Sequence, residues 1–102
     1  MKIKTYLGFS VKSNQIVYGI DNLITTKKKV HLIVACKTLT DNGLNQLLKF
    51  ANKNNIEVVS PIEETLSELI NRNNCKIIGL TNGNLCKAIL NCEQEIKIIY
   101  KG

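Results

Sequence analysis

The chain has 102 residues, enough for one domain that folds alone. Its hydrophobic fraction of 44% and charged fraction of 22% are typical of globular proteins and exclude a disordered or fibrous chain. A formal net charge of +6 favours an acidic partner such as a nucleic acid, and no apolar run approaches the ~20 residues that span a bilayer.

The first predicted elements are a helix, a short strand and the start of a second helix. Apolar residues at helical spacing predict a helix over residues 2–11. Residues 15–18, "QIVY", predict a strand that leads into Gly19, and Asp21 and Asn22 then open the second helix. A glycine, an acid and an amide on one turn either only start this helix or also bind a ligand. Both interpretations stay open at this point.

Buried strands alternate with amphipathic helices in the rest of the chain. Residues 30–36, "VHLIVAC", are apolar and rich in β-branched side chains, as in a strand that is covered on both faces. Residues 56–60 and 76–80 are two shorter strand candidates. Between these strands, apolar residues recur at helical spacing in segments 44–51 and 62–70, which predicts two helices.

Two of the helix starts have a recognisable sequence. In "SPIE", Ser60 is expected to be the N-cap, Pro61 the first helical residue and Glu63 the acid that completes a capping box. Residues 81–89, "TNGNLCKAI", begin with turn residues and continue with a short apolar face. The last helix is therefore expected to begin in this segment.

The alternation of helices and strands predicts one α/β domain, residues 1–102, folded as a three-layer α/β/α sandwich. Its sheet is expected to be small, four-stranded and largely parallel or mixed, with residues 30–35 as a central strand. Residues 93–102, which include "EIKIIYKG", are expected to be either an edge strand or a loose tail.

The cysteines are isolated from one another and from the single histidine. No two form a C-x-x-C pair, and His31 lies inside an apolar run, where it is expected to pack in the core. Metal sites need closely spaced ligands, so neither a metal nor another cofactor is expected. Reduced, buried thiols and the lack of a signal-peptide pattern place the protein in the cytoplasm. The cysteines are Cys36, Cys75, Cys86 and Cys92.

Four segments in order carry a family resemblance: "YLGFSVKSNQIVYGIDNLI", "KKKVHLIVACKTLT", "IEVVSPIEETLSELI" and "KIIGLTNGNLCKAI". Together they span about residues 7–89 and resemble the ribosomal protein family L-seven-Ae, most closely its bacterial members of the YlxQ type. The resemblance implies an α-β-α sandwich that binds structured RNA, typically a kink-turn, which is a bent internal loop with tandem sheared G·A pairs. Ribosomal RNA is one such partner.

The family's signature lies on the turn at Gly19. By resemblance, the start of the second helix enters the RNA major groove with a Gly-x-Asn-Glu sequence that follows a lysine. Here Gly19 keeps the glycine and Ile20 fills the free position, whereas Asp21 and Asn22 replace the Asn-Glu pair and Tyr18 replaces the lysine. An acid accepts hydrogen bonds from guanine and an amide pairs with a base edge, so these residues either read bases or only start the helix.

Further candidates come from the basic residues and from a second loop. Lys12 and the lysines at 27–29 can hold phosphates, or they are solvated loop residues. By resemblance, the loop around residues 58–61 covers an extruded base. The candidate RNA-binding residues are Lys12, Tyr18, Gly19, Ile20, Asp21, Asn22, Lys27, Lys28, Lys29, Val59, Ser60 and Pro61.

Two functions fit these patterns. The first is RNA binding by a monomer that acts near the ribosome. The alternative is a protein-interaction module that keeps the fold and has lost specific RNA binding. No catalytic residues are predicted, because Glu63, Glu64 and Glu68 share one expected helix as a cap and a solvated face, and "TNGN" lacks a phosphate-loop pattern.

Overall fold

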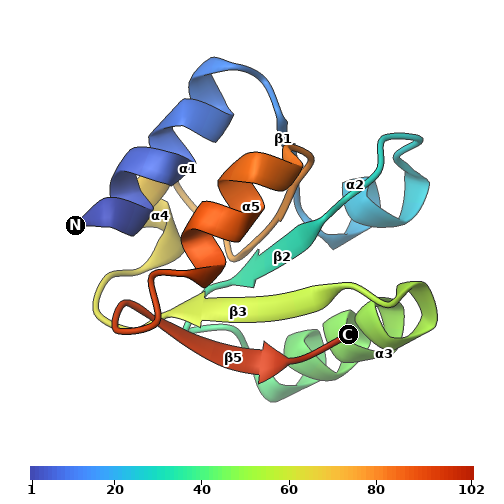
Figure 1. The fold of residues 1–102 in the computed structure, drawn as a ribbon. Coiled ribbons are helices and arrows are strands. Elements are labelled where there is room, and N and C mark those ends of the chain that lie inside the picture. The colour runs from blue at the N-terminus through green and yellow to red at the C-terminus, as the bar shows by residue number, and fades with distance from the viewer.

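Five helices alternate with five strands in the computed structural model, which describes residues 1–102 (Figure 1). None of the helices is both long and apolar enough to cross a bilayer. In chain order the elements are α1 (Lys2–Lys12), β1 (Ile16–Tyr18), α2 (Ile20–Thr25), β2 (Leu32–Ala35), α3 (Asp41–Asn54), β3 (Glu57–Pro61), α4 (Leu66–Ile70), β4 (Ile77–Leu80), α5 (Gly83–Leu90) and β5 (Ile96–Tyr100).

The strands form one open, mixed sheet with the order β1-β4-β2-β3-β5. Only β2 and β3 are parallel neighbours, and the other three pairs are antiparallel. The sheet has five strands rather than the four expected, because β5 pairs with β3 and makes the tail an edge strand. β2 lies in the middle with all of its residues buried, which confirms the expected central strand, although it covers only Leu32–Ala35 of the expected residues 30–35.

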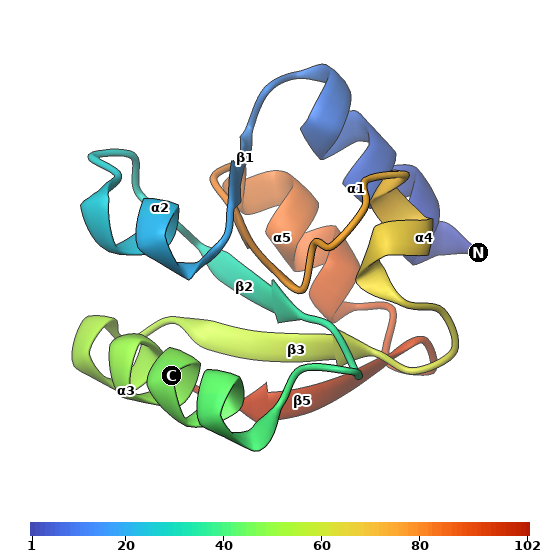
Figure 2. The same ribbon diagram turned by 180° about the vertical axis from the view of Figure 1, so that it is seen from behind.

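Apolar side chains cover both faces of this sheet. On one face, α1, α4 and α5 contribute to a cluster of 16 buried residues that includes Ile3, Leu66 and Ile89. On the other face, α2 and α3 contribute Leu23 and Leu47 to a cluster of 10 buried residues. Figures 1 and 2 show α1, α4 and α5 grouped together, and α3 beside the part of the sheet that β3 and β5 form.

The helix expected to follow Ser60 begins later in the chain. Ser60 and Pro61 are the last residues of β3 and are buried, since they pair with β5. The N-cap is Thr65, whose hydroxyl accepts a hydrogen bond from the Glu68 N–H at 3.3 Å. The Glu68 carboxylate accepts one from the Thr65 N–H at 3.1 Å and another from the Thr65 hydroxyl, which holds the pKa of Glu68 below its usual value. A second Ser/Thr-x-x-Glu sequence, rather than the first, starts α4.

The expectation that His31 packs in the core is wrong. β2 begins one residue later, at Leu32, and the His31 side chain is exposed. Its backbone N–H donates to the Leu80 carbonyl at 2.8 Å. A Cβ added to Gly83 would lie 3.7 Å from the imidazole, so the ring lies beside the start of α5 rather than between the helices and the sheet.

The cysteines are buried and unpaired, which agrees with their expected role as small apolar side chains. Burial raises the pKa of Cys86 to about 12 and also raises that of Cys75. Burial acts in the same direction on Cys36. There, hydrogen bonds with the Thr38 hydroxyl and the Leu66 N–H outweigh it and lower the pKa of the thiol.

Candidate nucleic-acid interface

The turn between β1 and α2 is shaped by Gly19. Its φ of 82° and ψ of 157° lie in a region that is open almost only to glycine. The Gly19 N–H donates to the Ile77 carbonyl at 2.9 Å, which holds the turn against the start of β4. The Gly19 carbonyl accepts from the Leu23 N–H at 3.1 Å and so begins α2. The backbone therefore requires this glycine whether or not a ligand binds here.

The acid and the amide on this turn differ in their surroundings. The Asn22 amide nitrogen donates to the Tyr18 carbonyl at 2.7 Å, so this side chain already has a structural role. The Asp21 side chain is exposed, and only its backbone carbonyl is bonded, by the Thr25 hydroxyl at 3.1 Å. Ile20 is half-buried and packs against the cluster on its side of the sheet. The Asp21 carboxylate and the Asn22 amide oxygen are both free to accept hydrogen bonds from a ligand, whereas the Asn22 amide nitrogen is already bonded.

An arginine from a distant part of the chain lies over Tyr18. The guanidinium carbon of Arg72 is 3.9 Å from the centroid of the Tyr18 ring. Arg72 belongs to the loop between α4 and β4, which reaches Tyr18 because β4 pairs with β1. This loop and the turn at Gly19 enclose an open hollow of about 260 Å³, which is also lined by Asn22 and Lys76. The Arg72 guanidinium therefore lies beside the turn, whereas the Lys76 ammonium is bonded to the Thr38 carbonyl after β2.

Neither Arg72 nor Lys76 was among the residues predicted from the sequence. Their loop is held in place at several points. Asn71 and Asn74 adopt positive φ angles of 53° and 57°, which asparagine tolerates. The Lys76 ammonium donates to the Thr38 carbonyl at 3.4 Å. The signal in the sequence was a basic residue within the polar run "NRNNCK", but its position beside Gly19 depends on the pairing of β1 with β4.

The structure separates the lysines at 27–29 from the turn at Gly19. They follow the C-terminal end of α2 and precede β2, whereas Gly19 precedes α2. α2 has six residues, so the two groups are about 9 Å apart along its axis at 1.5 Å per residue. A helix this short also adds little dipole at its N-terminus. The three lysines are exposed and form a separate positive patch.

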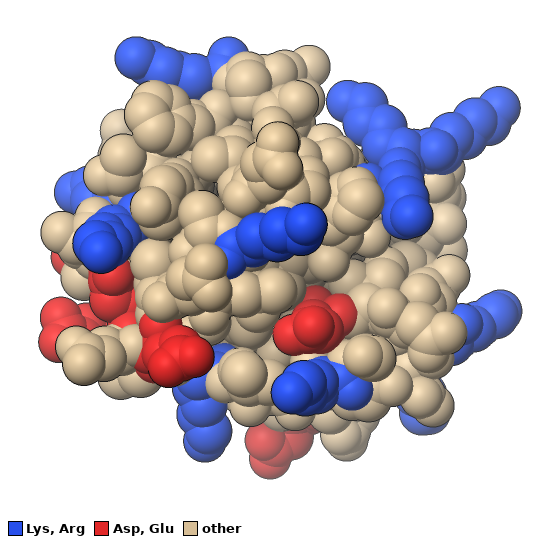
Figure 3. Space-filling model, in the orientation of Figure 1, with Lys and Arg blue, Asp and Glu red and all other residues tan.

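Lys12 also lies away from the turn. It ends α1 and precedes β1, whereas Gly19 follows β1. Figure 3 shows basic side chains over the upper end of α1 and over the loop between α2 and β2, and acidic side chains at the lower left, near the loops that lead into α4 and β5. On this face, basic side chains occur at both ends of the molecule, whereas the acidic ones are confined to the lower half.

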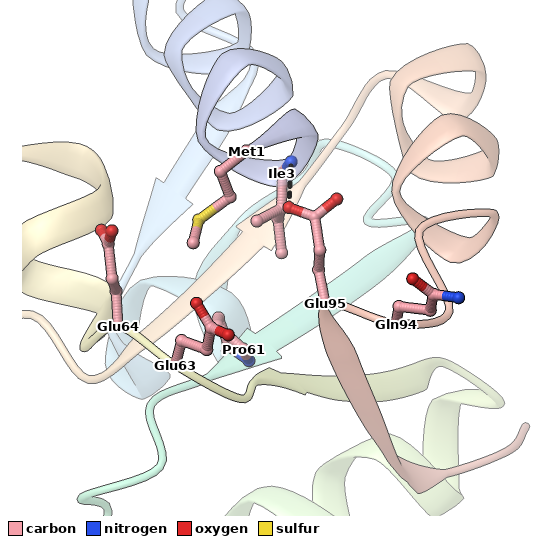
Figure 4. Close-up of a pocket in the computed structure, with 7 residues that line it drawn as sticks. All are labelled: Met1, Ile3, Pro61, Glu63, Glu64, Gln94 and Glu95. Atoms are coloured by element: carbon pink, nitrogen blue, oxygen red, sulfur yellow. Dashed lines mark hydrogen bonds between the residues drawn. The ribbon is translucent and has the colours of Figure 1, made fainter.

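The loop expected at residues 58–61 is part of a strand. Val59 and Ser60 are 0% and 6% exposed within β3, and they cannot cover a base in this position. Pro61, also buried, lines a hollow of about 310 Å³ that carries the carboxylates of Glu63, Glu64 and Glu95 (Figure 4). In this hollow, a carboxylate oxygen of Glu95 accepts a hydrogen bond from the Ile3 N–H at 3.3 Å. Negative charge at this hollow repels phosphate, so we do not keep Val59, Ser60 and Pro61 as RNA contacts.

The surface around Arg72 offers both hydrogen-bond donors and hydrogen-bond acceptors to a ligand. A guanidinium offers five donors in a planar fork that matches the oxygens of a phosphate. The aromatic ring beneath it holds this fork in place, at a gain of about 0.5–1 kcal/mol for an exposed pair. Asp21 offers acceptors to the N–H groups of a guanine edge.

Comparison of the sequence with protein-family models and with curated proteins finds no match.

Proposed function

We propose that the chain is an RNA-binding protein of the ribosomal L-seven-Ae type, with a three-layer α/β/α fold, that acts as a cytoplasmic monomer near the ribosome. Its RNA is structured and kink-turn-like. The contact surface consists of Tyr18, Gly19, Asp21, Arg72 and Lys76. The observation that supports this proposal is the position of Arg72, 3.9 Å above the Tyr18 ring and beside the turn at Gly19.

Kink-turn-like RNA suits this surface because of its shape. A regular A-form major groove is too narrow for side chains, so proteins read RNA at bends, bulges and unpaired bases. A tight bend also brings phosphates of two strands close together. The Arg72 guanidinium then binds these phosphates, and the negative charge of the exposed Asp21 weakens the attraction. The family signature has a lysine at the position that Tyr18 occupies here. In this arrangement, Arg72 supplies the positive charge of that missing lysine.

A protein-interaction module is the second candidate function, and two observations favour it. The Asn22 amide nitrogen is already bonded to the Tyr18 carbonyl at 2.7 Å, and the exposed Asp21 carries a negative charge toward the surface that RNA would approach. Under this alternative, the fold is kept and the base-reading contacts are lost.

A gel-shift titration with three RNAs separates the two functions. The probes are a kink-turn, the same RNA with its G·A pairs mutated, and a plain duplex of equal length, all at one fixed salt concentration. RNA binding of the proposed type predicts that the kink-turn binds most tightly. The interaction module predicts that all three bind equally weakly or not at all.

A further inference from the structure

A second hollow, the α2–α3 hollow, lies between the loop that follows α2 and the last turns of α3. It has a volume of about 260 Å³, and none of its lining residues is acidic. Sites for drug-sized ligands usually measure ~300–1,000 Å³, so this hollow suits a single apolar side chain rather than a cofactor. Its apolar lining consists of four aliphatic residues, Leu23, Ile24, Val30 and Ile56, and one aromatic residue, Phe50.

One wall of the α2–α3 hollow is an apolar side chain that the core does not use. α2 buries Leu23, which is 2% exposed, whereas the next residue, Ile24, is 59% exposed, more than any other large apolar side chain of the chain. Val30 and Ile56 are buried and form the floor of the hollow. Covering Ile24 with an apolar group of a partner would remove this surface from water, which favours association.

Two lysines lie at the rim of the α2–α3 hollow. Lys28 and Lys29 line it, and both side chains are exposed. Thr26 holds their loop, since its N–H donates to the Asn22 carbonyl at 2.9 Å and its hydroxyl accepts from the Lys28 N–H at 3.2 Å. Figure 3 shows basic side chains projecting from this loop. The hollow therefore combines an apolar floor with a positive rim.

We propose that the α2–α3 hollow binds an acidic linear peptide of a partner protein. One apolar side chain of the peptide occupies the hollow, and the flanking carboxylates pair with Lys28 and Lys29. The positive rim favours an anionic partner over a neutral or basic one.

The lining favours a peptide over an RNA base as the occupant. Proteins hold unpaired bases chiefly by stacking them on aromatic rings. The only ring in this hollow, Phe50, is half-buried, and the rest of the apolar lining is aliphatic. The inference goes beyond the RNA binding proposed above and does not depend on it.

The test is a fluorescence-anisotropy titration with three labelled octapeptides at low fixed salt. The leucine peptide has six glutamates around a central pair of leucines. The serine peptide has serines in place of the leucines, and the neutral peptide has glutamines in place of the glutamates. The leucine peptide is expected to bind about tenfold more tightly than the serine peptide, because burial of one leucine side chain contributes at least that factor. It should also bind more tightly than the neutral peptide. Equal binding of the leucine and serine peptides would overturn the inference.

Substitutions with matched controls locate the peptide. Ile24→Ser should weaken the leucine peptide about fivefold or more and leave the serine peptide unchanged. Ile98→Ser, at a side chain of β5 that is 51% exposed, should have less than a twofold effect. Equal effects of the two variants on the leucine peptide, with both folded by circular dichroism, would contradict a site at Ile24.

The rim lysines have a matched control of their own. Lys28→Gln combined with Lys29→Gln should weaken both glutamate peptides severalfold. Lys4→Gln combined with Lys97→Gln removes the same charge at exposed positions on α1 and β5 and should have less than a twofold effect. Equal effects of the two double variants would show that the peptides respond only to net charge, which overturns the inference.

RNA in the same hollow is the competing outcome. The lysines attract the phosphates of any RNA, so Ile24 is the residue that distinguishes the occupants. Kink-turn affinity should be unchanged in Ile24→Ser, and a loss of RNA affinity without an effect on the leucine peptide would overturn the inference.

The two proposed sites fail independently. Arg72→Gln should weaken binding of the kink-turn RNA and leave binding of the leucine peptide unchanged. If the leucine peptide binds as described and the kink-turn shows no preference over a duplex, the α2–α3 hollow is supported and the kink-turn function is rejected. If the kink-turn is preferred and the leucine peptide does not bind, the peptide site is rejected and the function proposed above stands.

Discussion

The guanidinium of Arg72 stacks on the ring of Tyr18, with 3.9 Å between the guanidinium carbon and the ring centroid. Tyr18 ends β1, and Arg72 lies in the loop before β4, which pairs antiparallel with β1. The contact therefore brings a positive charge to the turn at Gly19 from a segment more than fifty residues away in the sequence. It also holds the loop at 71–76 against the end of the sheet.

The space around two glycines predicts opposite effects of alanine substitution on the stability of the protein. A Cβ on Gly79 would collide with a Leu23 methyl group and lie 3.0 Å from a Val30 methyl group, all within the core. Gly79→Ala should destabilise the protein by about 1–3 kcal/mol. A Cβ on Gly8, inside α1, meets nothing within 4 Å. Gly8→Ala should stabilise it by about 0.5–1 kcal/mol. Urea unfolding measures both, and a stabilising Gly79→Ala would contradict the packing of Leu23.

Burial of the Cys86 thiol predicts a loss of stability at high pH. The pKa of Cys86 is raised from its ordinary 9.0 to about 12, so the unfolded chain loses this proton at lower pH than the folded protein. The stabilising effect is complete below pH 9 and is lost as the pH rises toward 12, by about 1.4 kcal/mol per unit. Thermal unfolding at pH 8 and pH 10 should show this loss.

The Cys86→Ala variant is the control for the pH effect. Removing the thiol should make the decrease in unfolding free energy between pH 8 and pH 10 smaller than in the unmodified protein, because the lysines titrate equally in both. The same decrease in both proteins would show that the thiol does not contribute.

The exposed lysines at 27–29 should contribute to affinity for every RNA without choosing among them. Replacing all three with alanine should reduce the slope of log affinity against log salt concentration. The slope should fall by roughly 2–3 in magnitude, since each phosphate contact contributes about 0.7–0.9. The preference for a kink-turn over a duplex should persist, because these lysines lie at the other end of α2 from Gly19. The matched control replaces Lys4, Lys49 and Lys97, which are also exposed. An equal change in slope for both triple variants would show that only net charge matters.

The free carboxylate of Asp21 predicts a gain of affinity on neutralisation. Asp21→Asn removes repulsion of the RNA and gives the residue found in the family signature, so kink-turn affinity should rise roughly twofold to fivefold, equivalent to about 0.4–1 kcal/mol. Asp41 is the matched control, since it is an exposed acid in the first turn of α3. A loss of binding to one particular RNA in Asp21→Asn, with other RNAs unaffected, would instead identify Asp21 as a base reader.

Local sequence patterns were sufficient for the elements that depend on local contacts. β2 is apolar at every position because its side chains alternate between two buried clusters, and α3 and α5 have one apolar face each. Gly19 was correctly expected at a turn, because its backbone conformation is open almost only to glycine. For these elements, the periodicity of apolar residues and the turn residues are sufficient to predict the secondary structure.

The errors concern contacts between segments that are distant in the sequence. β3 continues through Ser60 and Pro61 because β5 pairs with it, and the first capping sequence is thereby absorbed into a strand. Arg72 has no pattern that links it to Tyr18, since the link is the pairing of β1 with β4. The sequence left open whether the Asn22 amide reads a base or only helps to start the helix, and its nitrogen bonds the carbonyl four residues earlier in a geometry that only the folded turn provides.

The most direct test of RNA binding at the Arg72–Tyr18 surface is the dissociation constant of the kink-turn RNA for two single variants at one low salt concentration. Arg72→Gln should weaken binding about tenfold or more and reduce the preference over a duplex, because a hydrogen bond from a charged donor is worth about 1.5–3 kcal/mol. Lys49→Gln, with the same loss of charge on an exposed face of α3, should change the dissociation constant less than threefold. Equal affinities and equal preferences in the two variants would contradict a site at Arg72.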